Sequence, residues 1–309
     1  MFDVRPRTRI AALILVTAFA GHAVPAPVSV KQISAAAKWV VHLDVDRFAV
    51  SQTCQTLTSD KKAGRAFQTQ LAKYRLLLGV DPLKDLRGIT LYGLENTGNR
   101  GLALLNGNLD PETTVKRLQA YPQYHSKTIG QTVLHQWRDR GTAAEMTACF
   151  YSPRVLLIGS DEGMIAEGAD VLSGRRANMV GAKPVLQLPS PTEGSFLVVA
   201  TRGYNGSPQE PLKALILRNT EAGTFQVAEK KGMVDATLRL TAVSSDAGFQ
   251  IEQVLNGLVV ASSLSDQAGG LAGLAQLSEI ARQDRIVSMH LNCPAREAAA
   301  VLAAGRMGQ

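Results

Sequence analysis

Three side chains that could bind a metal ion or transfer a proton occupy alternate positions near the start of the chain. They are His42, Asp44 and Asp46, in the stretch WVVHLDVDRF. An imidazole and two carboxylates could ligate zinc or manganese, or two carboxylates could act as an acid and base pair in hydrolysis. The alternative is structural, since every second side chain of a β-strand points to the same face and this face could simply be solvated.

Strand geometry favours the solvated face. Alternate side chains on a strand lie about 6.6 Å apart, whereas the donor atoms of metal ligands lie within about 2.0–2.6 Å of one point. A metal ion would need a ligand from another strand, and His135 or His125 are the candidates. On one open face Asp44 and Asp46 would both stay ionised, which disfavours an acid and base pair. A metal-dependent hydrolase using His42, Asp44, Asp46 and His135 is therefore the alternative hypothesis.

The first 23 residues have the pattern of a secretory signal peptide. Three arginines precede an apolar run over 10–20, and Gly21 and Ala23 provide the small residues of a cleavage site. The apolar run is shorter than the ~20 residues that span a membrane. We expect cleavage after Ala23 and a soluble mature chain, without a membrane span, in the periplasm or outside the cell. The alternative is an uncleaved signal that anchors a sensor or scaffold.

The composition disfavours nucleic-acid binding and leaves the cysteines unassigned. Removing the signal peptide takes away three Arg and one Asp, so the formal charge falls from +7 to +5. The remaining basic residues are scattered, without interleaved aromatic residues. Cys54, Cys149 and Cys293 show no zinc-binding spacing, and any of three pairings could form one disulfide. No G-x-S-x-G nucleophile motif and no P-loop occurs, and we expect no cofactor.

Patterning predicts an α+β unit over 37–174, after a polar linker at 24–36. A strand over 39–48 is followed by a helix over 60–78 and by a hairpin of LRGITLYGL and RGLALLNGNL joined at ENTGN. Asp110 and Pro111 indicate the start of the next helix. Further strands follow, and a last helix begins after Ser160 and ends at Gly174.

A Pro-containing linker at 175–194 leads to a second unit over 195–309 with a similar order of elements. Its hairpin turns at Lys230-Lys231-Gly232. A long helical region is expected over 246–281, broken near Gly269, before the closing strand RIVSMHLNCP and a terminal helix. We therefore predict an internal duplication: two tandem ferredoxin-like βαββαβ units, with antiparallel sheets and helices on one face.

The early WVVHxDxD strand, the DLRGITLYG and GQTVLHQW strands and the helix ending near VLSG give the chain a family resemblance. Over residues 37–174 it resembles a group of exported bacterial proteins without an assigned activity, and the second unit matches more loosely. This resemblance implies an extracytoplasmic α+β protein and implies no catalytic residue.

We therefore expect an exported, non-enzymatic α+β protein whose uncovered sheet faces bind a protein or another component of the cell envelope. The residues expected to line these faces are polar and lie on strands: His42, Asp44, Asp46, Thr90 and Tyr92 in the first unit, and Asp235, Arg239 and His290 in the second.

Overall fold

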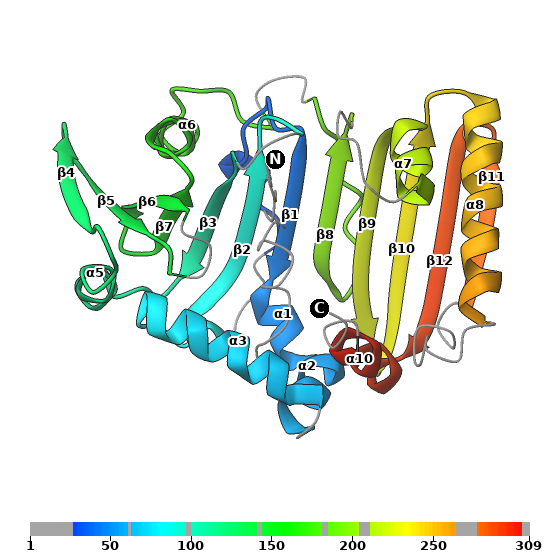
Figure 1. Ribbon diagram of the computed structural model, residues 1–309, viewed down its shortest axis with the longest axis horizontal. Helices are drawn as coiled ribbons and strands as arrows, with labels where there is room; N and C mark the ends of the chain where they lie inside the picture. Colours follow the sequence, from blue (N-terminus) through cyan, green and yellow to red (C-terminus); the bar gives the residue numbers. More distant parts are fainter. Residues whose placement is uncertain are drawn as a thin grey trace, which may run out of the picture.

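The computed structural model describes residues 27–60, 63–96, 100–140, 144–180, 185–203, 211–263 and 277–304, so the predicted signal peptide lies outside the described residues. These residues form one sheet of twelve strands (Figure 1). The strands are β1 (Trp39–Asp44), β2 (Leu86–Gly93), β3 (Leu102–Gly107), β4 (His125–Ile129), β5 (Thr132–Arg138), β6 (Glu145–Ser152), β7 (Val155–Gly159), β8 (Ser195–Arg202), β9 (Thr220–Lys230), β10 (Met233–Ala242), β11 (Ser278–Gln283) and β12 (Ile286–Pro294).

Helices fill the connections between the strands. They are α1 (Val45–Val50), α2 (Gln52–Ser59), α3 (Ala63–Leu78), α4 (Pro82–Asp85), α5 (Pro111–Leu118), α6 (Glu162–Leu172), α7 (Pro211–Arg218), α8 (Ser245–Ser263) and α10 (Ala295–Ala304), with the short 3₁₀ turn η2 (Val30–Gln32). None of the helices in the described part of the chain is long and apolar enough to cross a membrane.

The strand order across the sheet is β11-β12-β10-β9-β8-β1-β2-β3-β7-β6-β5-β4. All neighbouring strands are antiparallel, and β1 and β8 join the two halves at the centre. The α+β class is therefore confirmed. Two tandem ferredoxin-like units are not confirmed, because the split βαβ motif of that fold needs parallel strands in one sheet and β1 lies between two antiparallel partners.

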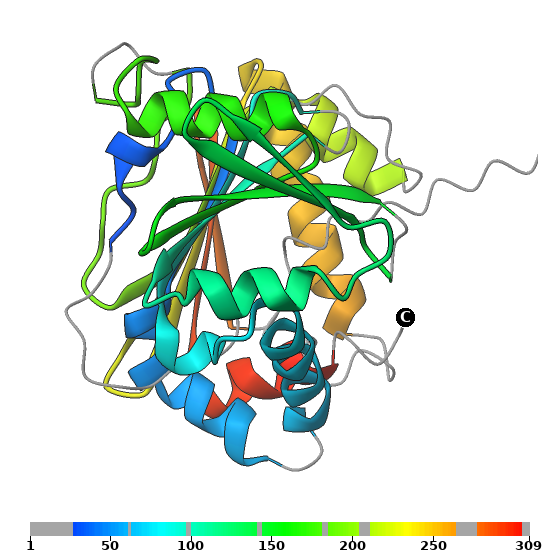
Figure 2. The ribbon, with the colours of Figure 1, turned by 90° about the vertical axis from the view of Figure 1, so that its left-hand side faces the viewer.

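The two halves of the sheet nevertheless share one strand order. Counted outward from the centre, the first half (β1–β7) reads β1-β2-β3-β7-β6, and the second half (β8–β12) reads β8-β9-β10-β12-β11. The hairpin of β4 and β5 extends the first half beyond this shared order. Viewed from the β4 end, the strands there cross those of the second half at a large angle, as expected for a twisted sheet (Figure 2).

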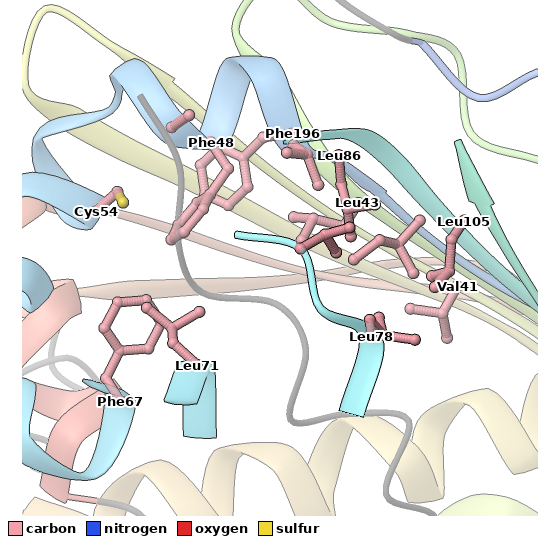
Figure 3. Close-up of a cluster of buried hydrophobic side chains, with 14 of the residues drawn as sticks. Val41, Leu43, Phe48, Cys54, Phe67, Leu71, Leu78, Leu86, Leu105 and Phe196 are labelled. Atoms are coloured by element: carbon pink, nitrogen blue, oxygen red, sulfur yellow. The ribbon is translucent and has the colours of Figure 1, made fainter. Parts of the chain in front are cut away.

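One face of the sheet, called here the Val41 face, carries the largest apolar cluster. Val41 and Leu43 on β1 pack beneath residues of α1, α2 and α3, among them Phe48, Phe67 and Leu71 (Figure 3). The C-terminal helix α10 joins the same cluster, because it packs against α2 and α3 and not only against its own half. The helical layer of the first half therefore includes residues from the end of the chain.

The opposite face, called here the His42 face, is also covered in the first half. Ile33 from the N-terminal segment, Met164 and Ile165 from α6, and Leu186 pack over it and are buried. The two segments expected to be linkers therefore contain packed, buried residues. They also hydrogen-bond to each other, since Ala35 N donates to Ala177 O and Val185 N donates to Ala35 O.

The second half has helices on the Val41 face. Ala247, Ile251 and Leu255 of α8 pack against Leu240 and Val287 of the sheet. The helix expected over 246–281 is wrong at its end, because residues 278–283 form strand β11, and its expected break near Gly269 lies outside the described residues. In β11 Ile280 packs toward the α8 cluster while its neighbours are exposed, a period-two pattern that a helical interpretation obscures.

Candidate functional site

The residues His42, Asp44 and Asp46 do not form one polar face. Each is buried, and the strand ends at Asp44 because that residue caps a helix. Asp44 Oδ1 accepts a hydrogen bond of 3.0 Å from the backbone N–H of Arg47, so Asp46 lies in the first turn of α1. The expected strand over 39–48 is therefore too long, and the expected solvated face is wrong at these positions.

Each of these side chains has its own local environment. His42 Nδ1 lies 2.9 Å from Thr90 Oγ1 on β2, in a buried pair. Asp46 Oδ2 lies 3.4 Å from Arg87 Nη1. Burial raises the pKa of the Asp46 carboxyl above its usual value, against the opposing effect of the Arg87 charge. The arrangement holds the end of β1 and the start of α1 in place.

Tyr92 is also fully buried, beneath the cover of the His42 face. Burial raises the pKa of its phenol far above the ordinary value, and the charge of Glu167 on α6 acts in the same direction. Glu167 accepts a hydrogen bond of 2.8 Å from Ser34 Oγ and lies 2.7 Å from Arg176 Nη1. These contacts fasten the N-terminal segment and α6 over the sheet, so Thr90 and Tyr92 cannot contribute to an exposed surface.

The alternative metal site is not assembled. His135 lies on β5, five strand positions from β1, with its Nδ1 2.9 Å from the Tyr124 hydroxyl. It belongs to the same side of β5 as Trp137, which is in the Val41-face core. His125 is exposed on β4. Among the described residues, no group of three His, Cys, Asp or Glu side chains is placed to hold one metal ion.

The three cysteines are buried in different apolar clusters. Cys54 lies in the Val41-face core, Cys149 under the cover of the His42 face, and Cys293 beside α10. Cys149 and Cys293 are free thiols, and burial raises the pKa of Cys149 to about 11. The disulfide that the sequence allows is therefore not formed between Cys149 and Cys293, and both behave as small apolar core residues.

A row of cross-strand neighbours crosses most of the sheet on the His42 face and changes from buried to exposed. Its members are paired in register: Leu157, Leu104, Thr90, His42, Val198, Gln226, Thr237, His290 and Glu279. Exposure is 0 % at Leu104, 4 % at His42 and 8 % at Gln226, and it reaches 42 % for the His290 side chain. The cover therefore ends after β9.

Gln226 marks this boundary. Its side-chain amide hydrogen-bonds with the hydroxyls of Thr192, at 3.0 Å, and Ser195, at 2.9 Å. Thr192 belongs to the last part of the segment that covers the first half. On the next strand, β10, no described element lies over Thr237, because α8 and α10 pack against the alternate residues Leu240 and Val234 on the Val41 face.

The exposed end of the row forms an open patch with its neighbours on β10, β11 and β12. The patch consists of Asp235, Thr237, Arg239, Glu279, Ser288, His290 and Asn292, which all point to the His42 face by strand alternation. His290 Nε2 lies 2.8 Å from Asp235 Oδ2, and 49 % of the Asp235 side chain is exposed. The structure thus brings together the three site residues expected in the second unit, and it buries the five expected in the first.

The patch offers hydrogen-bond donors and acceptors and charges of both signs. Asp235 and Glu279 carry carboxylates, Arg239 carries a guanidinium, and Thr237 and Ser288 carry hydroxyls. Because these side chains project from strands, their backbone positions are fixed by the ladder and little order must be gained on binding. Such an array can meet a polar surface that itself has charged and hydrogen-bonding groups.

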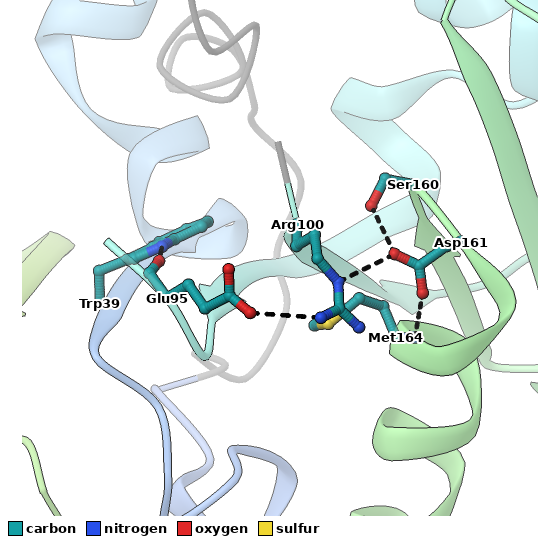
Figure 4. A network of polar contacts seen from close by, with 6 residues as sticks. All are labelled: Trp39, Glu95, Arg100, Ser160, Asp161 and Met164. Carbon is teal, nitrogen blue, oxygen red and sulfur yellow. Dashed lines mark hydrogen bonds and ion pairs between the residues drawn. The ribbon is translucent and has the colours of Figure 1, made fainter. Parts of the chain in front are cut away.

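A polar network that the sequence analysis did not predict holds α6 in its place over the first half (Figure 4). Arg100 bridges Glu95 and Asp161, at 3.2 Å to each carboxylate, and Asp161 caps α6 by accepting from Met164 N. Trp39 Nε1 donates to Glu95 O at 2.9 Å. Position 93 is a glycine because the indole of Trp39 occupies the space that a Cβ there would need. This glycine is the one feature of the sequence that points to the packing of Trp39.

Comparisons with known proteins agree with the fold and add no activity. No family model and no curated protein matches the chain. Among solved structures, it is similar to crystal form III of TP0453, with a TM-score of 0.51 at 9 % identity, over 90 % of this chain and 98 % of that one. Crystal form IV of TP0453 gives a TM-score of 0.48 at 9 % identity. At this identity the likeness to crystal form III shows that the chain shares the overall fold of TP0453.

Proposed function

We propose that the chain is an exported binding protein and that the open patch is its contact surface for a protein or another polar component of the cell envelope. The observation that supports this proposal is the row from Leu157 to Glu279. One side of one sheet is sealed as far as β9, by α6 and two chain segments, and the described residues leave it uncovered, with polar side chains, on β10, β12 and β11.

One feature of the sequence supports export, and one feature of the fold supports an internal duplication. The basic, apolar and small-residue pattern of residues 1–23 is typical of an export signal. We also infer an internal duplication, because both halves of the sheet have the same strand order. The duplicated units then differ in one respect that matters for binding, namely which face their last helix covers.

The test uses the mature chain, residues 24–309, with a photo-crosslinking residue in place of Thr237, against the envelope fraction of the source cells. We expect a discrete cross-linked product that Arg239→Glu weakens strongly, because it reverses the one guanidinium in the patch. Lys116→Glu on α5 is the matched control, since Lys116 is also exposed and lies on another element, far from the patch. Equal cross-linking of the wild type and Arg239→Glu would contradict the proposal.

A further inference from the structure

We propose that the outer edge of β4 binds an extended peptide segment of a partner protein, which adds to the sheet as an antiparallel strand. This surface is separate from the open patch, because β4 ends the sheet in the first half and the patch lies near the other end of the sheet. The class of partner is determined by the backbone, since only another extended chain can pair with a free ladder of N–H and C=O groups.

The position of β4 leaves its outer side open. Within the described chain β4 pairs with β5 alone, and all five of its residues are exposed. In Figure 1 β4 ends the sheet at the left, with no helix drawn beyond it. The pairing with β5 runs without a bulge from His125 to Ile129, so the outer edge is straight enough to accept a partner strand.

The turn of the hairpin determines which amides face outward. Ile129 and Thr132 flank a two-residue turn in which Gly130 has φ 61°, and residues that flank such a turn exchange their backbone hydrogen bonds. Hydrogen-bonded and non-hydrogen-bonded pairs then alternate along an antiparallel ladder. The N–H and C=O groups of Ser126 and Thr128 therefore point away from β5, toward the open side.

The strand at the opposite edge of the sheet has a neighbouring helix and a paired charge. There α8 packs beside β11, and Arg282 of β11 forms an ion pair of 2.9 Å with Glu252 of α8. On β4 the one central charge, Lys127, is partly neutralised by Glu162 Oε1 at 2.5 Å. Charged side chains, bulges and covering helices are the usual protections of edge strands, and β4 keeps only a neutralised lysine.

The side chains of β4 define the partner further. Lys127 and Ile129 point to the same face, and an ammonium has three donors, of which Glu162 takes one. Ile129 is 53 % exposed. In an antiparallel pair an acidic residue opposite Lys127 and an apolar residue opposite Ile129 would each make a favourable cross-strand contact. The segment should therefore carry an apolar residue two positions before an acidic one.

The probe is a fluorescein-labelled peptide, Thr-Val-Thr-Glu-Thr-Thr, which places Val opposite Ile129 and Glu opposite Lys127. We expect saturable binding to the full mature chain, weakened about ten-fold or more by Thr128→Pro, which removes an outward amide. Thr128→Val is the matched control and should bind within about two-fold of wild type, because it keeps the amide. In Lys127→Met the peptide with Gln in place of Glu should bind as well as the original.

A second form of the probe keeps the test independent of how the variants fold. N-methylation of the peptide residue that faces Thr128 removes the other hydrogen bond of this pair, in which the peptide N–H donates to the Thr128 carbonyl, and it should abolish binding to the wild type. Equal binding of the methylated and unmethylated peptides would overturn the proposal. So would a lack of saturable binding up to about 1 mM. A dimer of the wild type that Thr128→Pro dissociates would overturn the partner assigned here in favour of a second copy of the chain.

Discussion

His42 and His290 stand in one cross-strand row on the same face of the sheet, yet the first is sealed beneath a cover and the second contacts solvent. The difference comes from the elements that cover this face, which in the first half are the N-terminal segment, the segment with Leu186 and the helix after the last strand. After β7 the chain forms α6, which returns over the His42 face, whereas after β12 it forms α10, which crosses to α2 and α3 on the other face. A residue's position on a strand fixes its face, and distant segments decide whether that face is covered.

The largest expected loss of stability comes from a substitution at the buried end of the row of cross-strand neighbours. Leu104→Ala removes a fully buried side chain and should lower the free energy of unfolding by about 2–5 kcal/mol. Thr237→Ala, its matched control in the second half of the sheet, should change it by less than about 0.5 kcal/mol. Urea denaturation of both variants measures the difference. Similar losses at the two positions would show that the second half is covered as well.

The next largest loss of stability is expected when His42, rather than His290, is replaced by alanine. His42→Ala leaves the buried Thr90 hydroxyl without its imidazole partner, and we expect a loss of about 1–3 kcal/mol. His290→Ala breaks only an exposed contact with Asp235, and the expected change is within about 0.5 kcal/mol. Thermal unfolding at pH 7.5 measures both. A costly His290→Ala would indicate that the open patch is part of the stabilising structure.

Glu229 on β9 links the two halves and tests whether they unfold together. Its carboxylate accepts hydrogen bonds from Gln52 N at 2.6 Å and from Thr53 N at 3.0 Å, at the start of α2. Glu229→Ala should therefore cost about 0.5–2 kcal/mol, as for the loss of a helix cap. We expect the loss in a single unfolding transition monitored by circular dichroism. Two separated transitions in the variant would show that the halves are independent.

The smallest expected effect is a dependence of the folding stability on pH, which arises from His135 in the first half. Burial lowers the pKa of His135, so the unfolded chain takes up a proton near pH 6.5 before the folded protein does. The stability that neutral His135 contributes is present above this pH and is lost as the pH falls through the lowered pKa. We expect the wild type to lose more stability between pH 7 and pH 5 than His135→Gln. Equal pH profiles of the two proteins would contradict this assignment.

Local chemistry made part of this structure predictable. Asp110 and Pro111 begin α5 as expected, and the turn at Lys231 and Gly232, both with positive φ, joins β9 to β10. The α+β class could be predicted from such signals, because caps and turns depend on residues close in sequence. Asp235, Arg239 and His290 lie on one face of the sheet, as strand alternation predicts.

The errors have a common physical origin. Asp44 was assigned to a solvated strand face, although an Asp at the end of a strand equally suits a helix cap. His42, Thr90 and Tyr92 were expected at the surface because polar residues usually are. Their burial depends on Ile33, α6 and Leu186, which meet over the sheet from two distant parts of the chain, the N-terminal segment and residues 162–186. The strand order likewise depends on which edges pair, and periodicity within a segment carries no information about that choice.

The crossing of α10 has a consequence for how the protein is made. Ala299 and Ala303 complete a core whose other members include Phe67 and Leu71, more than two hundred residues earlier. A nascent chain cannot close this layer until α10 has emerged, and contacts between such distant residues form slowly because a long loop must close first. A ribosome that stalls before Ala295 would therefore hold an open polypeptide, accessible to chaperones and proteases.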